Sequence, residues 1–180
     1  ISHLRVGDIA RLGMLRTFQQ TRIYTKMDCV DNMQISVSHR PGAKSSMFAS
    51  RKGEIRDRAE HLLEFVGLYS KRSLISGDLS FGQQKLLEFA MALMNEPKVL
   101  LLDEPTAGIN PTLINGLIDR LRRANEELGI TLCVIEHNMR VIMNLASHIY
   151  CLSNGKMLAD GEPEMLQNDP RVIDAYLGGH

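Results

Sequence analysis

The feature that most constrains the fold is a short apolar run, Val99–Leu102, which ends in two adjacent carboxylates, Asp103 and Glu104, before Pro105. A run of this length bounded by turn residues is typical of a strand that is covered on both faces. Strands of that kind belong to parallel sheets with helices on either side. Open sheets of this class bind ligands at the carboxyl ends of their strands, so the acid pair lies where a site is expected.

Strands and helices alternate through the second half of the chain, which favours an α/β fold with a mostly parallel sheet. Asn154-Gly155 is a strong hairpin signal. Residues 21–50 show little periodicity, and the Ser-, Lys- and Gly-rich run 42–53 is expected to be a surface loop. We expect helices over residues 8–12, 54–66, 80–94, 110–128 and 138–146, with short ones in the tail, and strands over 14–18, 99–102, 130–135, 149–152 and 157–159.

Composition excludes some classes of partner and compartment. The 180 residues carry 21 basic and 21 acidic side chains, so no global field favours nucleic acid or an anionic membrane. Three separated cysteines form no C-x-x-C pair, and we expect reduced thiols, most simply buried apolar side chains. No apolar run approaches the roughly 18 residues of a membrane-spanning helix. The chain starts at Ile1, without methionine, on a polar stretch that resembles the middle of a domain's sequence, so we expect it to be truncated.

The acid pair has two interpretations from its residues alone. A carboxylate directly after a strand, such as Asp103, can hold Mg²⁺, while its neighbour Glu104 orients or deprotonates a water. The same residues also fit a polar strand end beside a turn. His137 follows the next predicted strand and could reach the same crevice or be structural, and Gln19 has no stronger interpretation than a loop amide.

A second candidate site lies at the predicted start of the helix over 80–94. Ser80 and Gln83 form an S-x-x-Q capping box, and a helix N-terminus of this kind is also an anion site. The capping box does not explain Gly82, because glycine in a first turn costs about 1 kcal/mol of helix stability. Close approach of a phosphate to the backbone would explain it.

Together these stretches resemble the nucleotide-binding subunits of ATP-binding cassette (ABC) transporters. The resemblance rests on Leu79–Gln83, Leu100–Gly108 and Val134–His137, and it extends across nearly the whole chain. It implies a partial ABC ATPase cassette of the α/β class, with a mostly parallel core sheet and an α-helical lobe. The parts would be a remnant of the N-terminal core over residues 1–20, the helical lobe over 21–95, and the C-terminal part of the core with its tail over 96–180.

The resemblance implies ATP and Mg²⁺ as cofactors and a role for each motif residue. Asp103 would bind Mg²⁺, Glu104 would be the general base that activates the attacking water, and His137 would contact the γ-phosphate. Gln19 would approach the metal and the water, and would link the site to the membrane subunits. The cofactor-binding residues would be those of the signature motif, which closes over ATP held by the opposite subunit, and one of the D-loop: Leu79, Ser80, Phe81, Gly82, Gln83 and Asn110.

Further stretches, among them Arg16–Tyr24, Ile135–Met139 and the tail 159–178, resemble the ATPase subunits of branched-chain amino acid importers. That branch implies a dimer with a second ABC ATPase on two membrane permease subunits, fed by a periplasmic solute-binding protein, with no nucleic acid partner. Its place would be the cytoplasmic face of a bacterial or archaeal inner membrane. Importers of urea or amides have similar tails, and soluble ABC proteins that act on ribosomes or DNA are a more distant alternative.

Departures from the family pattern also bear on function. Phe81 replaces the usual glycine of the signature motif, and Asn110 stands where many relatives have aspartate. The 180 residues contain no G-x-x-x-x-G-K-[ST] motif, the P-loop whose amides and lysine cradle the phosphates. We therefore expect the 180-residue chain to hydrolyse no ATP by itself. A non-functional gene remnant is a further alternative, against which the intact Asp103, Glu104 and His137 argue.

Overall fold

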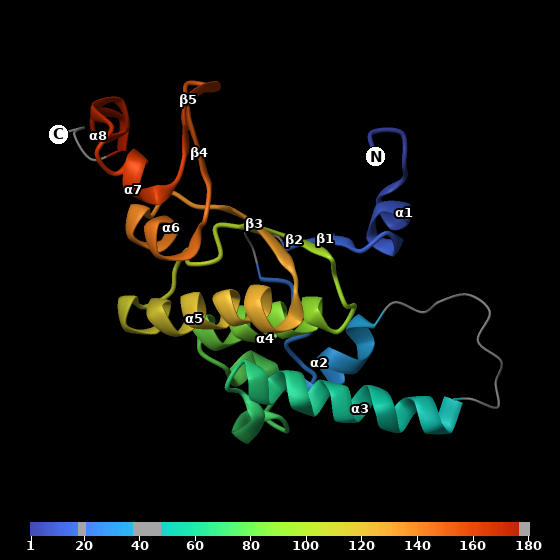
Figure 1. Cartoon of the computed structure of the whole chain (residues 1–180). Helices are drawn as coiled ribbons and strands as arrows, with labels where there is room; N and C mark the ends of the chain where they lie inside the picture. The colour runs from blue at the N-terminus through green and yellow to red at the C-terminus, as the bar shows by residue number, and fades with distance from the viewer. Residues whose placement is uncertain (18–20, 38–47, 177–180) are drawn as a thin grey trace. The chain divides into compact units, whose positions relative to one another are not determined.

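A computed structural model describes residues 1–17, 21–37 and 48–176 of the chain (Figure 1). The chain forms two compact units, residues 1–135 and 136–180, and each is described by itself. Gln19, for which a catalytic role is predicted, lies outside the described residues. The division into parts 1–20, 21–95 and 96–180 stays a prediction.

A three-stranded parallel sheet forms the centre of the first unit. Its order is β1 (Met14–Arg16), β2 (Val99–Asp103) and β3 (Thr131–Ile135). Within the sheet, Leu100 of β2 pairs with a leucine on each neighbouring strand and is fully buried. The apolar run therefore forms the central strand, as its sequence predicts, but Leu100 and Leu102 are buried on one face only, while Val99 and Leu101 on the other face are partly exposed, so the expected cover on both faces is wrong for the described residues. The first strand is shorter than predicted, although the amide of Thr17 still donates to the carbonyl of Leu101 at 2.9 Å.

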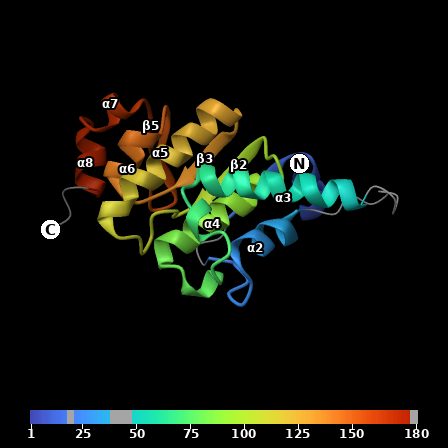
Figure 2. The same ribbon diagram turned by 90° about the horizontal axis from the view of Figure 1, so that it is seen from below.

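The two connections between neighbouring strands of this sheet differ greatly in length. α5 (Pro111–Leu128) joins β2 to β3 in a simple strand–helix–strand unit. β1 and β2 are also neighbours, yet a whole helical region separates them in sequence. Figures 1 and 2 show α4 and α5 along one face of the sheet, with α2 and α3 beyond α4. The elements before β2 are α1 (Val6–Arg11), α2 (Cys29–Ser36), α3 (Phe48–Phe65), the 3-10 turns η2 (Tyr69–Lys71) and η3 (Ser76–Asp78), and α4 (Phe81–Leu93).

Helix caps that can be read from the sequence are present in the structure. Ser80 and Gln83 exchange hydrogen bonds in both directions, so the capping box at the start of α4 is confirmed. Asn110 caps α5 by accepting from the amide of Thr112 at 3.0 Å. Gly129 ends α5 in the left-handed region, with φ of +66°, which favours glycine.

In the helical region, one helix has no signal in the sequence and one expected loop is partly wrong. The segment 21–50 has little periodicity, yet it contains α2, which Asp28 caps by accepting from the amide of Asp31 at 2.7 Å. The loop expected over 42–53 is wrong for residues 48–53, because α3 begins at Phe48, and residues 42–47 lie outside the described residues. Lys52 favours helix, and α3 continues through Gly53 although glycine in a helix interior lowers the stability of the helix.

A buried asparagine explains why α2 lacks an apolar pattern. The side chain of Asn32 is fully buried and accepts from the amide of Tyr24 at 2.8 Å. Its own amide donates to the carbonyl of Tyr24 at 3.1 Å and to Oγ of Ser76 at 3.1 Å. A polar residue thus occupies a core position and connects α2, the segment at Tyr24 and η3.

We expect Asn32→Ala to destabilise the chain by about 3 kcal/mol, because it leaves several buried polar groups without partners. Chemical denaturation followed by far-UV circular dichroism measures this. Asn168→Ala is the matched control, since Asn168 is exposed and donates to a single carbonyl, and it should change stability by less than about 0.5 kcal/mol. Equal effects of the two substitutions would contradict this account of α2.

The second unit is a hairpin with short helices around it. Its elements are α6 (Met139–Leu145), β4 (Ile149–Ser153), β5 (Lys156–Gly161), α7 (Pro163–Leu166) and α8 (Pro170–Tyr176). β4 and β5 pair antiparallel. Asn154 and Gly155 both have positive φ, 50° and 74°, as a tight hairpin turn requires, so the predicted hairpin is confirmed. The hydroxyl of Tyr176 donates to the carbonyl of Leu152 at 2.5 Å, and this hydrogen bond connects α8 to the hairpin.

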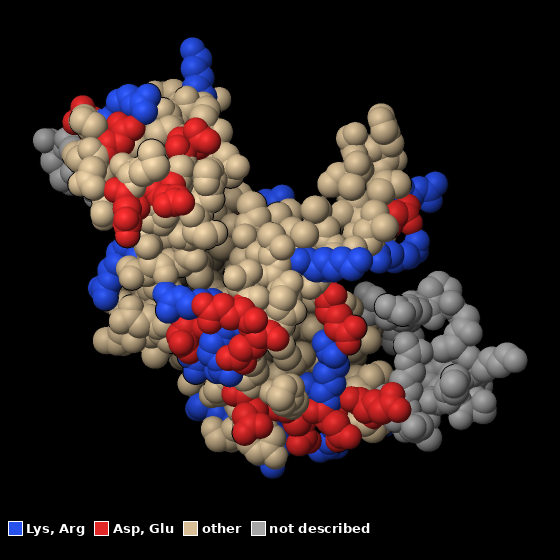
Figure 3. All heavy atoms as spheres, viewed as in Figure 1, with Lys and Arg blue, Asp and Glu red and all other residues tan. Residues whose placement is uncertain are grey.

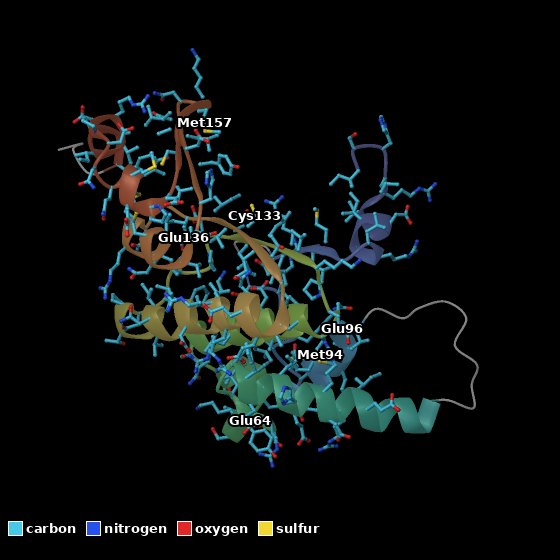
Figure 4. All side chains as sticks on the ribbon, in the orientation of Figure 1. Glu64, Met94, Glu96, Cys133, Glu136 and Met157 are labelled. Carbon is cyan, nitrogen blue, oxygen red and sulfur yellow. The ribbon has the colours of Figure 1, made fainter. Side chains whose placement is uncertain are left out.

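Two of the three cysteines are buried and one is exposed. Cys29 and Cys151 are buried, as expected, whereas Cys133 is exposed on β3 and points away from α4 and α5 (Figure 4). Burial raises the pKa of the Cys29 thiol to about 11, with a further contribution from Asp28.

Figure 3 shows acidic and basic side chains interspersed on the face in view. Among the described residues, no helix combines the length and apolar character of a membrane span.

Candidate functional site

The acid pair lies where the central strand ends in a sharp turn. β2 ends at Asp103, and Glu104 takes a left-handed backbone conformation with φ of +46°. This conformation costs a non-glycine residue about 1–2 kcal/mol. The amide of Glu104 donates to the carbonyl of Ile135 at 2.9 Å, which ties the turn to the end of β3. Backbone strain of this kind is typical of functional positions.

Asp103 has a cationic partner on the neighbouring strand. Nη2 of Arg16, the last residue of β1, donates to Oδ2 of Asp103 at 2.8 Å. Leu100 and Leu102 of β2 are buried on the face that α4 and α5 cover. Because strand side chains alternate, Asp103 leaves the sheet on the opposite face. In the sequence, Arg16 has no role beyond belonging to the stretch that includes Gln19.

The structure brings the predicted signature motif against the loop that follows the acid pair. A Cβ at Gly108, whose φ is +73°, would lie 2.9 Å from the Phe81 ring. A Cβ at Gly82 would lie 3.3 Å from Leu113 and 3.6 Å from Ile109. The Leu113 contact is to the end of a flexible, half-exposed side chain, so packing of α4 on the start of α5 favours a small residue at Gly82 without requiring glycine, and the phosphate approach inferred from the sequence stays a prediction.

A pair of buried charged residues lies behind these motifs, on the helix face toward the sheet. Glu88 of α4 is 9% exposed, and Lys85 one turn earlier is 6% exposed. Burial raises the pKa of the Glu88 carboxyl above its usual value. Oε1 of Glu88 accepts from the amide of Arg22 at 3.3 Å. The small cavity that both residues line also contacts Thr17, so α4 is connected to both sides of the segment 18–20. This pair is not predictable from the sequence, because helical spacing alone does not show which charged side chains are buried.

His137 belongs to the second unit. Its amide and that of Asn138 share one acceptor, Oε2 of Glu136, at 3.1 and 3.3 Å. Asn138 in turn caps α6 by accepting from the amide of Val141 at 3.4 Å. These contacts order the backbone around His137, while the predicted contact of its side chain with a phosphate remains a prediction.

The donor set at the acid pair fits one kind of metal. Within residues 1–17, 21–37 and 48–176, no group of three or more His, Cys, Asp or Glu side chains is placed to hold an ion. Mg²⁺ in nucleotide sites needs no such cage, because it takes one or two carboxylates and fills its other positions with phosphate oxygens and water. A single carboxylate at a strand end, with Asp103 25% exposed, suits that mode.

Comparison with known proteins decides the family. Residues 7–107, more than half of the chain, match the family model described as ABC transporter. The chain belongs to the ABC transporter family. Residues 156–180 match a second model, described as branched-chain amino acid ATP-binding cassette transporter.

Relatives of this ABC protein are similar over almost its whole length. It is 36% identical over 177 residues to the high-affinity branched-chain amino acid transport ATP-binding protein BraF of Pseudomonas aeruginosa, and 34% identical to LivG of Escherichia coli. In both cases the match covers 94% of this chain and 69% of the relative. An Archaeoglobus fulgidus relative, a probable LivG, is 35% identical over 178 residues.

A solved structure shows the same fold. The crystal structure of an ATP-binding cassette of an ABC transporter in its ADP conformation matches with a TM-score of 0.78 and 31% identity. The match covers 96% of this chain and 71% of that one. The predicted α/β ATPase cassette with a parallel sheet is therefore confirmed, and so is the family resemblance on which the site residues were assigned.

Proposed function

We propose that this ABC ATPase energises an importer of branched-chain amino acids. The observation that carries this proposal is the agreement between two separate parts of the chain. Residues 7–107 match the general family, while the tail, residues 156–180, matches the model named for branched-chain amino acid transporters. BraF and LivG, whose names state the same substrate class, match over both parts.

The proposed chemistry uses the turn after β2. Phosphoryl transfer depends on positioning and charge neutralisation, and bound Mg²⁺ would supply the neutralisation at the phosphates. Asp103 is the last residue of the central strand and pairs with Ile135 of β3, so its backbone is held in the sheet. Glu104, at the left-handed turn after Asp103, would accept the proton of the attacking water. His137 and Gln19 would act on the γ-phosphate and on the metal and water, respectively.

The proposed assembly is a dimer of ABC ATPases. Leu79–Gln83 and Asn110 would face ATP bound to the opposite subunit, since a helix N-terminus with free amides binds anions. Phe81 at this end of α4 is 45% exposed in the single chain. Its ring lies so close to Gly108 that a Cβ there would come within 2.9 Å of it. The dimer would sit peripherally on two permease subunits at the cytoplasmic face of the membrane, with a periplasmic solute-binding protein delivering the amino acid.

Co-purification tests the assembly. The protein for this test is a completed cassette, defined as residues 1–180 preceded by a segment that carries G-x-x-x-x-G-K-[ST]. Expressed with a second ATPase and the two permeases of a branched-chain amino acid importer, the completed cassette should purify with the permeases in detergent. Purification with ribosomes instead would favour a soluble ABC protein and contradict the proposal.

A further inference from the structure

An arginine on the neighbouring strand holds the carboxylate to which the proposed function assigns Mg²⁺. Arg16 pairs in register with Leu101 of β2, so its side chain leaves the sheet on the same face as that of Asp103. Its guanidinium Nη2 reaches Oδ2 of Asp103 at 2.8 Å, although the two residues are 87 positions apart in the chain. The parallel pairing of β1 with β2 is therefore what creates this contact.

Stability does not explain the ion pair. The side chain of Arg16 is 55% exposed and that of Asp103 is 25% exposed, and ion pairs in such surroundings add little to folding. The chain offers a comparison in the pair of Arg11 with Asp8, which are three residues apart on the exposed helix α1. Arg16 differs because its acceptor lies at the carboxyl end of the central strand, where ligands of parallel sheets bind.

We infer that Arg16 is a positioning residue for Mg²⁺: it holds Asp103 by Oδ2 and so directs Oδ1 to the metal. This inference rests on the role of Asp103 in the proposed function. A carboxylate at a strand end rotates about its Cβ–Cγ bond, and a short charge-assisted hydrogen bond to one oxygen restricts that rotation. Partners that orient a ligating carboxylate set metal affinity, and their removal typically lowers it about 10- to 100-fold.

The positive charge of Arg16 would lower the affinity for Mg²⁺, since it repels a divalent cation, whereas its orientation of Asp103 would raise that affinity. Orientation and repulsion therefore predict changes of opposite sign when the arginine is removed. The structure favours orientation, because β1 and β2 are joined by ladder pairs up to Arg16 itself and by the bond from Thr17 to Leu101 beyond it. The backbone of Arg16 is thus held beside β2, within reach of the Asp103 carboxylate to which its guanidinium donates at 2.8 Å.

Titration of the ¹⁵N-labelled 180-residue chain with Mn²⁺, a paramagnetic substitute for Mg²⁺, tests the inference. Broadening of the amide resonances of Asp103 and Glu104 gives the apparent dissociation constant. We expect Arg16→Met to weaken Mn²⁺ binding about 10- to 100-fold and Asp103→Asn to remove the site. Arg16→Lys should recover part of the affinity, because it keeps one donor. Arg11→Met removes the same charge from α1 and should leave the affinity unchanged.

Unchanged or tighter Mn²⁺ binding in Arg16→Met would overturn the inference, because the arginine would then only compete with the metal. Equal broadening in Asp103→Asn and in the wild type would overturn it too, since Asp103 would not be the ligand. If Arg16→Met fails to fold, the comparison of Arg16→Lys with the wild type still decides the sign of the change. None of these results depends on ATP turnover or import, so the proposed function succeeds or fails separately in the completed cassette.

Discussion

Replacing Glu104 by glutamine is expected to lower the rate of ATP hydrolysis by a completed cassette about 10²- to 10⁴-fold, the usual contribution of a general base. Glutamine keeps the size of the side chain but cannot take a proton from the attacking water. The left-handed backbone at Glu104 and its hydrogen bond to Ile135 do not depend on the carboxylate, so the turn should persist. The loss should therefore appear in kcat, with little change in KM.

Steady-state phosphate release measures this effect in the assembled transporter. Glu126→Gln is the matched control, because Glu126 is an exposed residue of α5 far along the helix from the acid pair, and its turnover should stay at the wild-type level. A loss of less than about tenfold in Glu104→Gln would show that another group serves as the base, and the assignment of Glu104 would then be wrong.

The second large effect concerns the 180-residue chain by itself. We expect its ATP turnover to be more than about 10³-fold below that of the completed cassette, because one donor to a developing charge is already worth about 10²- to 10³-fold and a P-loop supplies several. The described residues bring Asp103 and Glu104 together at the end of β2, but they include no glycine-rich loop with a lysine to hold the phosphates.

A P-loop segment in which the lysine is replaced by alanine is the control for this comparison. Joined to residues 1–180, it should restore much less turnover than the intact segment. Measurable turnover by the 180-residue chain alone, abolished by Glu104→Gln, would contradict the expectation, because the acid pair would then hydrolyse ATP without a phosphate cradle.

Local signals in the sequence predicted much of the fold. The apolar run of β2, the capping box at Ser80, the Asn110 cap of α5 and the Asn154-Gly155 turn each act within a few residues, and each is found in the structure. Such signals depend only on neighbouring backbone groups, so they need no knowledge of the tertiary fold.

The parts that could not be predicted depend on contacts between distant residues. α2 was missed because Asn32 is satisfied by groups that only the fold assembles, so a polar residue fills a core position. The pair of Arg16 with Asp103 depends on the strand order, and sequence spacing gives no sign of it. Gly82 was interpreted through a ligand, whereas its packing on Leu113 requires α4 and α5 to be placed first.

ATP-driven uptake of an amino acid tests the proposed import function. Proteoliposomes would contain the completed cassette, a second ABC ATPase and two permeases, with ATP inside, and solute-binding protein and radiolabelled leucine outside. The account predicts leucine accumulation that requires internal ATP and disappears with Glu104→Gln. No ATP-dependent accumulation of leucine, or equal accumulation with Glu104→Gln, would contradict it.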